Sequence, residues 1–271
     1  MRRILCQPGK GQAAPQREAD TISKSYDAFA AVYDRLMDDV DYGAWYKHYR
    51  ALFARAGIGK PRSIADVCCG TGAFSIRFAK DGAGVVGIDL SEEMLQAAQR
   101  EARKAGARVQ FVHMDATQLR LPKPADAILC ACDGVNYLST PDAAQSFFRR
   151  AHAALRPGGA LAFDVSTEHK FLHRLDGRAF GEDREDLCFL WTNAYEKETR
   201  LCHMELTLFT EESGGRFSRA FETHTQRAHS PEELEAWLSD AGFARVELFS
   251  DMILEPVRGD EDRLHVLAIR S

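Results

Sequence analysis

The sequence contains no hydrophobic run long enough to cross a membrane. A spanning helix needs about 20 consecutive apolar residues, and no run approaches that length, although 45% of the 271 residues are hydrophobic. The basic N-terminus MRRILCQPGKGQ has an apolar core of only Ile4, Leu5 and Cys6, which is too short for a secretory signal peptide. We therefore expect no membrane partner.

The chain also lacks the regular cysteine spacing of a zinc site or a disulfide framework. Its seven cysteines include one adjacent pair, Cys68 and Cys69, and no Cys-x-x-Cys motif. Two adjacent cysteines cannot easily clamp one tetrahedral zinc ion, so we expect no metal and interpret the pair as small apolar side chains that fill a strand end. Without an export signal, cysteines in a chain of this length are typically reduced thiols in the cytoplasm.

An excess of positive charge is missing as well. The formal net charge is -5 and the isoelectric point is near 6.0. A protein that binds nucleic acid through phosphate contacts is usually basic, so we expect no nucleic-acid partner. The length suffices to bury a large core in one domain, or in one domain with an insertion.

Between about residues 63 and 165, short apolar strands alternate with amphipathic helices. The strand expected at 127–132 is almost entirely apolar, as in a strand buried on both faces of a sheet. Ser91 and Thr140 are typical helix N-caps. This alternation predicts a doubly wound parallel sheet. The expected strands are 63–67, 84–89, 109–113, 127–132 and 160–165, and the expected helices are 72–81, 92–105 and 140–155.

The segments before this alternation have other patterns. Residues 1–20 show no periodicity and are expected to form a disordered tail. Residues 21–60 contain aromatic and aliphatic side chains at helical spacing, interrupted around Asp41 to Gly43. They predict an N-terminal cap of two amphipathic helices.

The segment after the alternation changes character at about residue 167. Residues 167–229 contain three longer strands and a Gly214-Gly215 turn, which is typical of an antiparallel insertion. Ser230-Pro231-Glu232-Glu233 is a capping box that begins another helix. The core is therefore expected to comprise 61–166 and 230–271. The expected strands of the insertion are 188–195, 201–210 and 217–227, and those that close the core are 246–249 and 264–269.

The first strand of the core ends in a glycine-rich turn, DVCCGTG. Gly70 and Gly72 allow a ligand to approach the backbone, and the following helix offers free N–H groups. Asp89 ends the second strand, where a carboxylate can accept hydrogen bonds from ribose hydroxyls. A nucleoside-containing cofactor is therefore expected. The dinucleotide fingerprint G-x-G-x-x-G is incomplete because its last position is Ser75.

Four segments together resemble the class I S-adenosylmethionine-dependent methyltransferases: DVCCGTG (66–72), VVGIDLSEEML (85–95), MDATQL (114–119) and LRPGGALAFDV (155–165). The N-terminal FAAVYDRLMDDVDYGAW and the segment ending in FETHTQRAHSPEELEAWLSDAGF resemble small-molecule members, the sugar-amine N-methyltransferases and their bacterial relatives. The likeness implies a Rossmann-like sheet of seven strands with the last antiparallel, and an insertion that forms a lid. The family usually has a glycine where this chain has Cys68.

The resemblance implies which residues bind S-adenosylmethionine, leaving S-adenosylhomocysteine as product. Asp66 helps to position the methionine amino group, Asp89 binds the ribose, and Leu90 and Met94 flank the adenine. Asp115 accepts from the adenine amino group. Other residues of this set are an aromatic hydroxyl on the N-terminal helix that carries Tyr26 and Phe29, the glycine turn, a backbone N–H and the loop after the fourth strand: Tyr33, Cys68, Gly70, Gly72, Ala116, Cys132 and Asp133.

Candidates for the acceptor site lie after the fourth strand and in the last strand of the insertion. Asn136 and Tyr137 follow strand 127–132 at the edge of the sheet where ligands bind, and Arg227 is a further candidate contact with the acceptor. The stretch FETHTQR alternates, so that Glu222, His224 and Gln226 share one face. If this face points toward the cofactor, His224 takes a proton from the acceptor and Glu222 orients the imidazole.

These observations favour an enzyme that methylates a nitrogen or oxygen of a small-molecule acceptor, as a monomer or a homodimer. A lid of about 60 residues suits an acceptor that must be enclosed. Three alternatives remain open: an RNA or protein methyltransferase, an NAD-dependent oxidoreductase, and a protein that binds S-adenosylmethionine without turnover. The sequence does not identify the acceptor.

Overall fold

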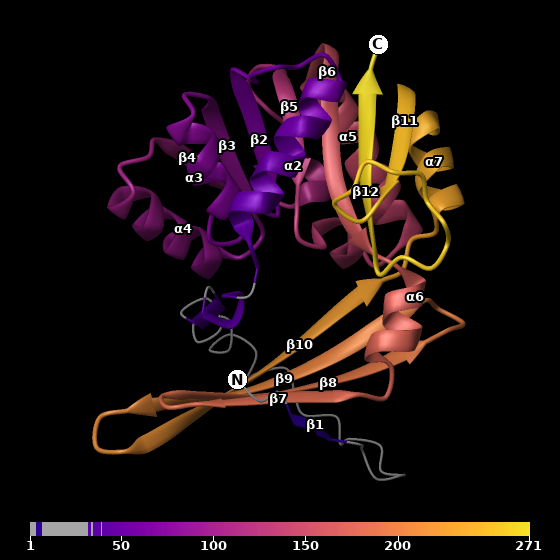
Figure 1. Cartoon of the computed structure of the whole chain (residues 1–271). Coiled ribbons are helices and arrows are strands. Elements are labelled where there is room, and N and C mark those ends of the chain that lie inside the picture. The colour runs from indigo at the N-terminus through magenta and orange to yellow at the C-terminus, as the bar shows by residue number, and fades with distance from the viewer. Residues whose placement is uncertain (1–3, 7–31, 34, 39) are drawn as a thin grey trace.

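The protein is described here by a computed structural model, which covers residues 4–6, 32, 33, 35–38 and 40–271. Figure 1 shows a large sheet flanked by helices and, across one end of it, a second sheet of long strands. The predicted contributions of Tyr26 and Phe29 lie outside the described residues. No helix in the described ranges is both long and apolar enough to cross a membrane.

The large sheet has seven strands in the order β11-β12-β6-β5-β2-β3-β4. Strand β12 runs antiparallel to both of its neighbours, while the pairs β2–β3, β2–β5, β3–β4 and β5–β6 are parallel. The predicted Rossmann-like sheet with an antiparallel last strand is therefore confirmed. Its strands are β2 Ser63–Val67, β3 Gly84–Asp89, β4 Val109–His113, β5 Ala125–Cys130, β6 Leu155–Ser166, β11 Phe243–Ser250 and β12 Arg263–Arg270.

Helices cover both faces of this sheet because each presents one apolar face to it. Tyr49 and Phe53 of α2 pack with Phe78 of α3 on one face, and Phe147 of α5 packs with Leu234 of α7 on the other. The helices are α2 Tyr42–Arg55, α3 Ala73–Lys80, α4 Glu92–Lys104, α5 Pro141–Ala154 and α7 Pro231–Asp240, with short 3-10 helices η2 Ala116–Gln118 and η3 Gly134–Tyr137.

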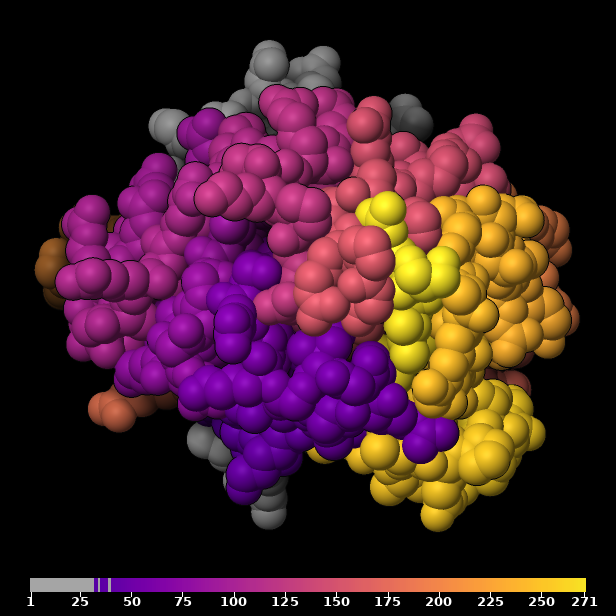
Figure 2. Space-filling model, turned by 90° about the horizontal axis from the view of Figure 1, so that it is seen from above, coloured from indigo at the N-terminus to yellow at the C-terminus, as the bar shows by residue number. Residues whose placement is uncertain are grey.

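The expected caps are present at the helix starts. Ser91 accepts from the backbone N–H of Met94, Thr140 caps α5, and Ser230 and Glu233 form the complete capping box of α7. Helix α2 also packs against the C-terminal strands. Arg55 pairs with Glu247 of β11 at 2.9 Å, and Figure 2 shows this early segment (indigo) beside the C-terminal strands (yellow).

The second sheet is antiparallel, with the order β1-β7-β8-β9-β10. The three strands expected in the insertion are present as β8 Leu187–Glu196, β9 Leu201–Glu212 and β10 Arg216–Arg227. The sequence analysis missed β7 Ala179–Arg184 and the helical pieces α6 Glu168–Lys170 and η4 Phe171–Leu175. Strand β1 Ile4–Cys6 pairs with β7. It belongs to residues 1–20, which were expected to form a disordered tail, and the rest of that segment lies outside the described residues.

The second sheet lies at the carboxyl ends of the parallel strands (Figure 1). The chain leaves the large sheet at Ser166, the end of β6, and β10 returns to it at Arg227, shortly before α7. The inward face of β9 is apolar, with Cys202, Met204 and Leu206 buried. This placement brings side chains of β10 opposite the loops that follow β2, β3, β4 and β5.

Candidate functional site

A cavity of about 630 Å³ lies at the carboxyl ends of the parallel strands, with His224 of β10 on its wall. It collects residues that are far apart in the sequence, from Tyr33 before α2 to the loop after β5. Ten of the twelve residues expected to bind the cofactor line this cavity: Tyr33, Asp66, Cys68, Gly70, Asp89, Leu90, Met94, Asp115, Ala116 and Cys132.

Backbone hydrogen bonds hold the glycine turn between β2 and α3, one of them to the neighbouring strand β3. The N–H of Cys69 donates to the carbonyl of Ile88 at 3.0 Å, and that of Gly72 donates to the carbonyl of Cys69 at 2.9 Å. Gly70 and Gly72 have φ values of 52° and 80°, in the left-handed region where glycine carries no steric cost. The turn can therefore lie close to a ligand.

Gly72 differs from what the sequence indicated, whereas Cys68 lies where it was expected. Gly72 is not among the residues that line the cavity; a Cβ there would lie 3.2 Å from Ala98 and Phe111, so this glycine permits close packing of α3 and α4. Cys68 lines the cavity and has a φ of 55°, an uncommon value for a residue with a side chain. It stands at the position where the resembling family usually has glycine.

Asp89 is fixed at the end of β3 by two backbone N–H groups. Its carboxylate accepts from Gly70 at 2.8 Å and from Ser91 at 2.9 Å. Burial raises the pKa of Asp89, and the backbone donors oppose that rise. The carboxylate of Asp89 lines the cavity, where its two oxygen atoms can accept hydrogen bonds from a pair of hydroxyl groups on a ligand.

Asp66 lies at the end of β2 and is only 1% exposed. The Ser75 hydroxyl donates to it at 2.6 Å, but burial raises its pKa to about 7. Among the described residues, no arginine, lysine or histidine forms a salt bridge with it. A buried carboxylate that lines the cavity in this way fits an ammonium group of a ligand, because the opposite charge offsets the desolvation of the anion.

Asp115 begins the short helix η2 and lines the same cavity. Its Oδ1 accepts from the backbone N–H of Thr117 at 2.8 Å, which fixes the orientation of the carboxylate. Ala116, Leu90 and Met94 supply apolar surface on the same wall. A flat apolar ring system with an exocyclic amino group matches this combination of acceptor and apolar surface.

Several sulfur atoms surround the cavity. Cys68, Cys69 and Cys132 line it, and the thiol of the buried Cys130 lies against Cys68, which together with burial raises its pKa. A search of the described residues finds no group of three or more histidine, cysteine, aspartate or glutamate side chains that could hold a metal ion. Cys69 is buried, and Cys68 is half-buried.

The strand β10 places three polar side chains in a row on its inward face. Glu222 and Gln226 are buried, His224 is half-buried, and the neighbouring Thr223 is exposed, as the predicted alternation requires. His224 Nε2 lies 3.3 Å from Glu222 Oε2, and its Nδ1 lies 3.4 Å from the hydroxyl of Tyr137. Tyr137 belongs to η3 of the core, so this contact crosses from the core to the second sheet.

The tyrosine and histidine also line the cavity, whereas Glu222 lies behind His224. Their rings meet edge to face with centroids 6.0 Å apart. A carboxylate, an imidazole and a phenol in sequence form a chain along which a proton is held or moved. The face of β10 that carries His224 therefore points toward the cavity, and the catalytic roles of His224 and Glu222 stay a prediction.

Asp133 does not line the cavity. Its carboxylate accepts from Arg263 at 2.6 Å and from the Ser166 hydroxyl at 2.7 Å. Burial opposes ionisation, but Arg263 and Lys170 hold the pKa of Asp133 well below its usual range. The residue is a partner of an arginine on β12 and not a wall of the cofactor site.

Arg227 and Asn136 also differ from the predicted contacts with the acceptor. Arg227 pairs with Glu233 at 2.8 Å and contacts His229 at 2.8 Å. Asn136 is fully buried and bonds to the backbone of Ser166 and Arg227. Neither residue is among those that line the cavity.

The loop after β5 has a strained backbone that Asp164 stabilises. Cys132 and Asp133 have φ values of 57° and 66°, both left-handed. Their N–H groups donate to the carboxylate of Asp164 at 2.7 and 3.1 Å, Tyr49 donates at 2.6 Å, and Arg263 also contacts it. Asp164 is therefore a buried anion with four donors, next to the wall of the cavity.

Sequence reasoning missed several residues of the cavity wall. Tyr42 and Phe74 line it from the starts of α2 and α3, and Met114 lies immediately before the predicted Asp115. Met114 is the first residue of the segment MDATQL, so its position directly before the predicted Asp115 could have indicated that it lines the cavity. The remaining additions are small or polar residues with no pattern of their own: Cys69, Thr71, Ala73, Ser91, Glu93, Thr117, Ala131, Gly134, Leu138, Ser139 and Ala143.

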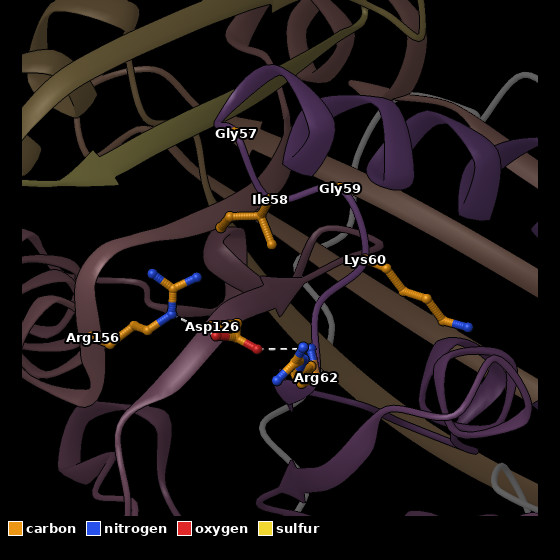
Figure 3. Close-up of a pocket in the computed structure, with 7 residues that line it drawn as sticks. All are labelled: Gly57, Ile58, Gly59, Lys60, Arg62, Asp126 and Arg156. Atoms are coloured by element: carbon orange, nitrogen blue, oxygen red, sulfur yellow. Dashed lines mark hydrogen bonds and ion pairs between the residues drawn. The ribbon is translucent and has the colours of Figure 1, made fainter.

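A second hollow, of about 370 Å³, lies beyond the end of α2, beside the start of β5 (Figure 3). Asp126 in its wall accepts from the backbone N–H groups of Arg62 and Ser63 at 2.7 and 3.0 Å and pairs with Arg156. In Figure 3 the Lys60 side chain points away from this cluster. The charges of Asp126 and Arg156 are paired with each other. We therefore interpret these contacts as structural, linking the segment before β2 to β5 and to Arg156.

Comparison with known proteins matches residues 64–159 to the family model described as a methyltransferase domain. A "Putative methyltransferase" of Geobacillus sp. (strain WCH70) is 30% identical over 244 residues, covering 90% of this chain and 99% of the relative. The "Putative methyltransferase YqeM" of Bacillus subtilis (strain 168) is 33% identical over 248 residues, covering 91% and 97%.

A solved structure gives the same result. An S-adenosylmethionine-dependent methyltransferase from Clostridium acetobutylicum ATCC 824 superposes with a TM-score of 0.82 at 25% sequence identity. The match covers 91% of this chain and 99% of that one. The likeness therefore extends over the large sheet and the second sheet together.

Proposed function

Because the chain belongs to the class I S-adenosylmethionine-dependent methyltransferases, we propose that it methylates a nitrogen or an oxygen atom of a small-molecule acceptor. One observation carries the proposal: His224 of the second sheet lines the same cavity as Asp66 and Asp89. A cavity of about 630 Å³ between the two sheets suits a cofactor and the reacting part of a small acceptor. In this proposal residues 167–229 act as a lid over the core.

The residues present fit the cofactor, and each is assigned one part of it. The Asp89 carboxylate would accept from the ribose hydroxyls, Asp66 would face the methionine ammonium group, and Asp115 with Ala116 would meet the adenine. When bound, S-adenosylmethionine supplies a methyl group on a positively charged sulfur, activated for in-line displacement. The protein's contribution is largely to hold the acceptor in line at near-contact distance and to exclude water.

The proton of the acceptor is assigned to the row of residues on β10. His224 would accept it from the nucleophile, while Glu222 at 3.3 Å orients the imidazole and stabilises the charge that develops on it. Nε2 would keep its proton toward Glu222, so Nδ1 would be the nitrogen that gains one, and the Tyr137 hydroxyl 3.4 Å from it would relay the proton from the acceptor. An amine that arrives with a free lone pair needs this base less than a hydroxyl group does.

The test is a fate-of-label experiment. The purified protein is incubated with S-adenosylmethionine carrying a labelled methyl group and a bacterial extract that is separated into metabolites, RNA and protein. Label in the metabolite fraction supports a small acceptor, and mass spectrometry then identifies the product. Label in RNA or protein contradicts it, and absence of transfer to every fraction of several extracts favours a protein that only binds the cofactor.

The role of His224 is tested with the identified acceptor. His224→Gln is expected to lower kcat by about 100-fold, the lower end of what a general base contributes, with little change in cofactor affinity. The matched control is His203→Gln, because His203 lies on the same sheet but on its exposed outer face. Equal activity in the two variants would remove His224 from the mechanism.

A further inference from the structure

Asn136 is bonded to the two places where the chain passes between the core and the second sheet. Its Nδ2 donates to the carbonyls of Ser166 and Arg227, each at 2.9 Å, and its Oδ1 accepts from the N–H of Ser166 at 2.9 Å. Ser166 is the last residue of β6 and Arg227 the last of β10. One buried amide therefore holds both ends of the insertion.

Two neighbouring contacts attach the same loop to the same ends. The Ser166 hydroxyl donates to Asp133 at 2.7 Å. His229, two residues after β10, donates from Nε2 to the carbonyl of Val135 at 3.1 Å and accepts from Arg227 at Nδ1. The ring is neutral in this role, because burial and Arg227 lower the pKa of His229 to about 4.

The residue that follows Asn136 lies in the wall of the cavity in which methyl transfer is proposed. Tyr137 lines the cavity, and its hydroxyl lies 3.4 Å from His224 Nδ1. His224 is three residues before Arg227 on β10, a short and regular stretch of strand. A shift of Arg227 relative to Asn136 would therefore move His224 relative to Tyr137.

We propose that Asn136 is a positioning residue for methyl transfer, which sets the register of β10 against η3 and so places His224 opposite Tyr137 in the cavity. Asn136 itself touches neither cofactor nor acceptor. This inference rests on the proposed role of His224. A displacement of about 1 Å at a reacting group costs on the order of 100-fold in rate, so a fixed register between the two sheets matters for transfer.

The experiment measures that register directly, without an acceptor. Full-length protein with labelled tyrosine and histidine is saturated with S-adenosylhomocysteine, and the nuclear Overhauser contact between the Tyr137 and His224 rings is recorded. Tyr137→Phe and His224→Gln assign the signals. In Asn136→Ala the contact is expected to fall at least threefold, and the amides of residues 218–227 to exchange hydrogen at least tenfold faster, while calorimetric affinity for S-adenosylhomocysteine changes less than twofold.

A control variant separates positioning from loss of stability. Phe78→Leu reduces a fully buried side chain of α3 that does not line the cavity, and lowers stability by another route. It is expected to keep the ring contact and the slow exchange of residues 218–227. A ring contact and exchange rates within twofold of the wild type in folded Asn136→Ala would overturn the proposal.

A second variant keeps the test decisive if Asn136→Ala does not fold. In Asn136→Asp the ionised side chain still accepts from Ser166 but donates to neither carbonyl, whereas its protonated form regains one donor. The ring contact is therefore expected to be weaker at pH 8 than at pH 6, relative to the wild type at the same pH. A contact equal to that of the wild type at both values would contradict the proposal. These readouts need no turnover, so they are independent of whether His224 is the base.

Discussion

At the scale of single residues, the proposed cofactor site contains buried carboxylates that form no salt bridge within the described residues. Asp66 is the extreme case, because among the described residues Ser75 is the one side chain that donates to it, and burial raises its pKa to about 7. Asp89 has two backbone donors and is less deeply buried. The difference predicts that the two aspartates respond differently to pH.

The affinity for S-adenosylmethionine is expected to depend on pH through Asp66. Binding of the ammonium group requires the ionised carboxylate, so affinity falls about tenfold per pH unit below 7 and levels off just above it, while the ammonium group keeps its proton. Calorimetric titrations between about pH 5.5 and 7.5 measure this slope. In Asp66→Asn the affinity should be lower and independent of pH over that range; an unchanged slope in the variant would assign the titration to another group.

At the scale of structural elements, the sequence predicted what local patterns control. The strands and helices of the core have short-range signals such as the Ser91 cap and the capping box of Ser230, and they were found within a few residues. Strand β7, with the sequence AFGEDR, was missed because it has no apolar alternation and forms by pairing with β8. The partners of Asp133 and Arg227 were missed because Arg263 lies 130 residues away and Glu233 belongs to the next helix.

Asp164 and Asp126 hold two different turns through similar contacts. We expect their substitution to lower the free energy of unfolding by different amounts. Asp164 and Asp126 each accept from two backbone N–H groups and one arginine, but Asp164 also accepts from Tyr49 and is fully buried, whereas Asp126 is partly exposed. Asp164→Ala is expected to lower the free energy of unfolding by about 3–5 kcal/mol, because Arg263 is left as a buried charge and the left-handed turn loses its acceptor.

Asp126→Ala is expected to cost only about 1 kcal/mol, since water replaces the lost partner at the surface. Urea unfolding followed by circular dichroism measures both values. Similar costs for the two substitutions would mean that burial of the Asp164 cluster adds nothing to the stability of the turn.

At the scale of the whole molecule, the N-terminal helix α2 is joined to the last strand by buried imidazoles. His48 of α2 and His265 of β12 have ring centroids 4.3 Å apart, and Trp45 and Tyr49 pack against His265. Among the described residues, neither ring nitrogen of His265 has a hydrogen-bond partner. Burial, together with His48 and Arg263, lowers the pKa of His265 to about 2.

This pair predicts a loss of stability in acid. Since the folded pKa of His265 lies below the value of about 6.5 in the unfolded chain, its contribution to stability is complete above pH 6.5 and is lost as the pH falls toward 2. Between pH 6.5 and 5 the wild type should lose about 2 kcal/mol more than His265→Leu. The exposed His203→Leu serves as control, and parallel curves for all three proteins would contradict this expectation.

The two ends of the insertion lie at the same place on the core, which determines how the insertion can be exchanged. Because the carbonyls of Ser166 and Arg227 bond to the same nitrogen atom, the segment between them begins and ends at one point on the core. Such a segment is a cassette that can be exchanged without lengthening or cutting the sheet that binds the cofactor.

Replacement of residues 168–226 by a few glycines and serines is therefore expected to leave a folded chain that still binds S-adenosylhomocysteine but transfers no methyl group. Circular dichroism and calorimetry test this, and failure of the shortened chain to bind would show that the core depends on the cassette. If that outcome holds, residues 168–226 determine which acceptor is methylated, and the rest of the chain suffices to bind the cofactor.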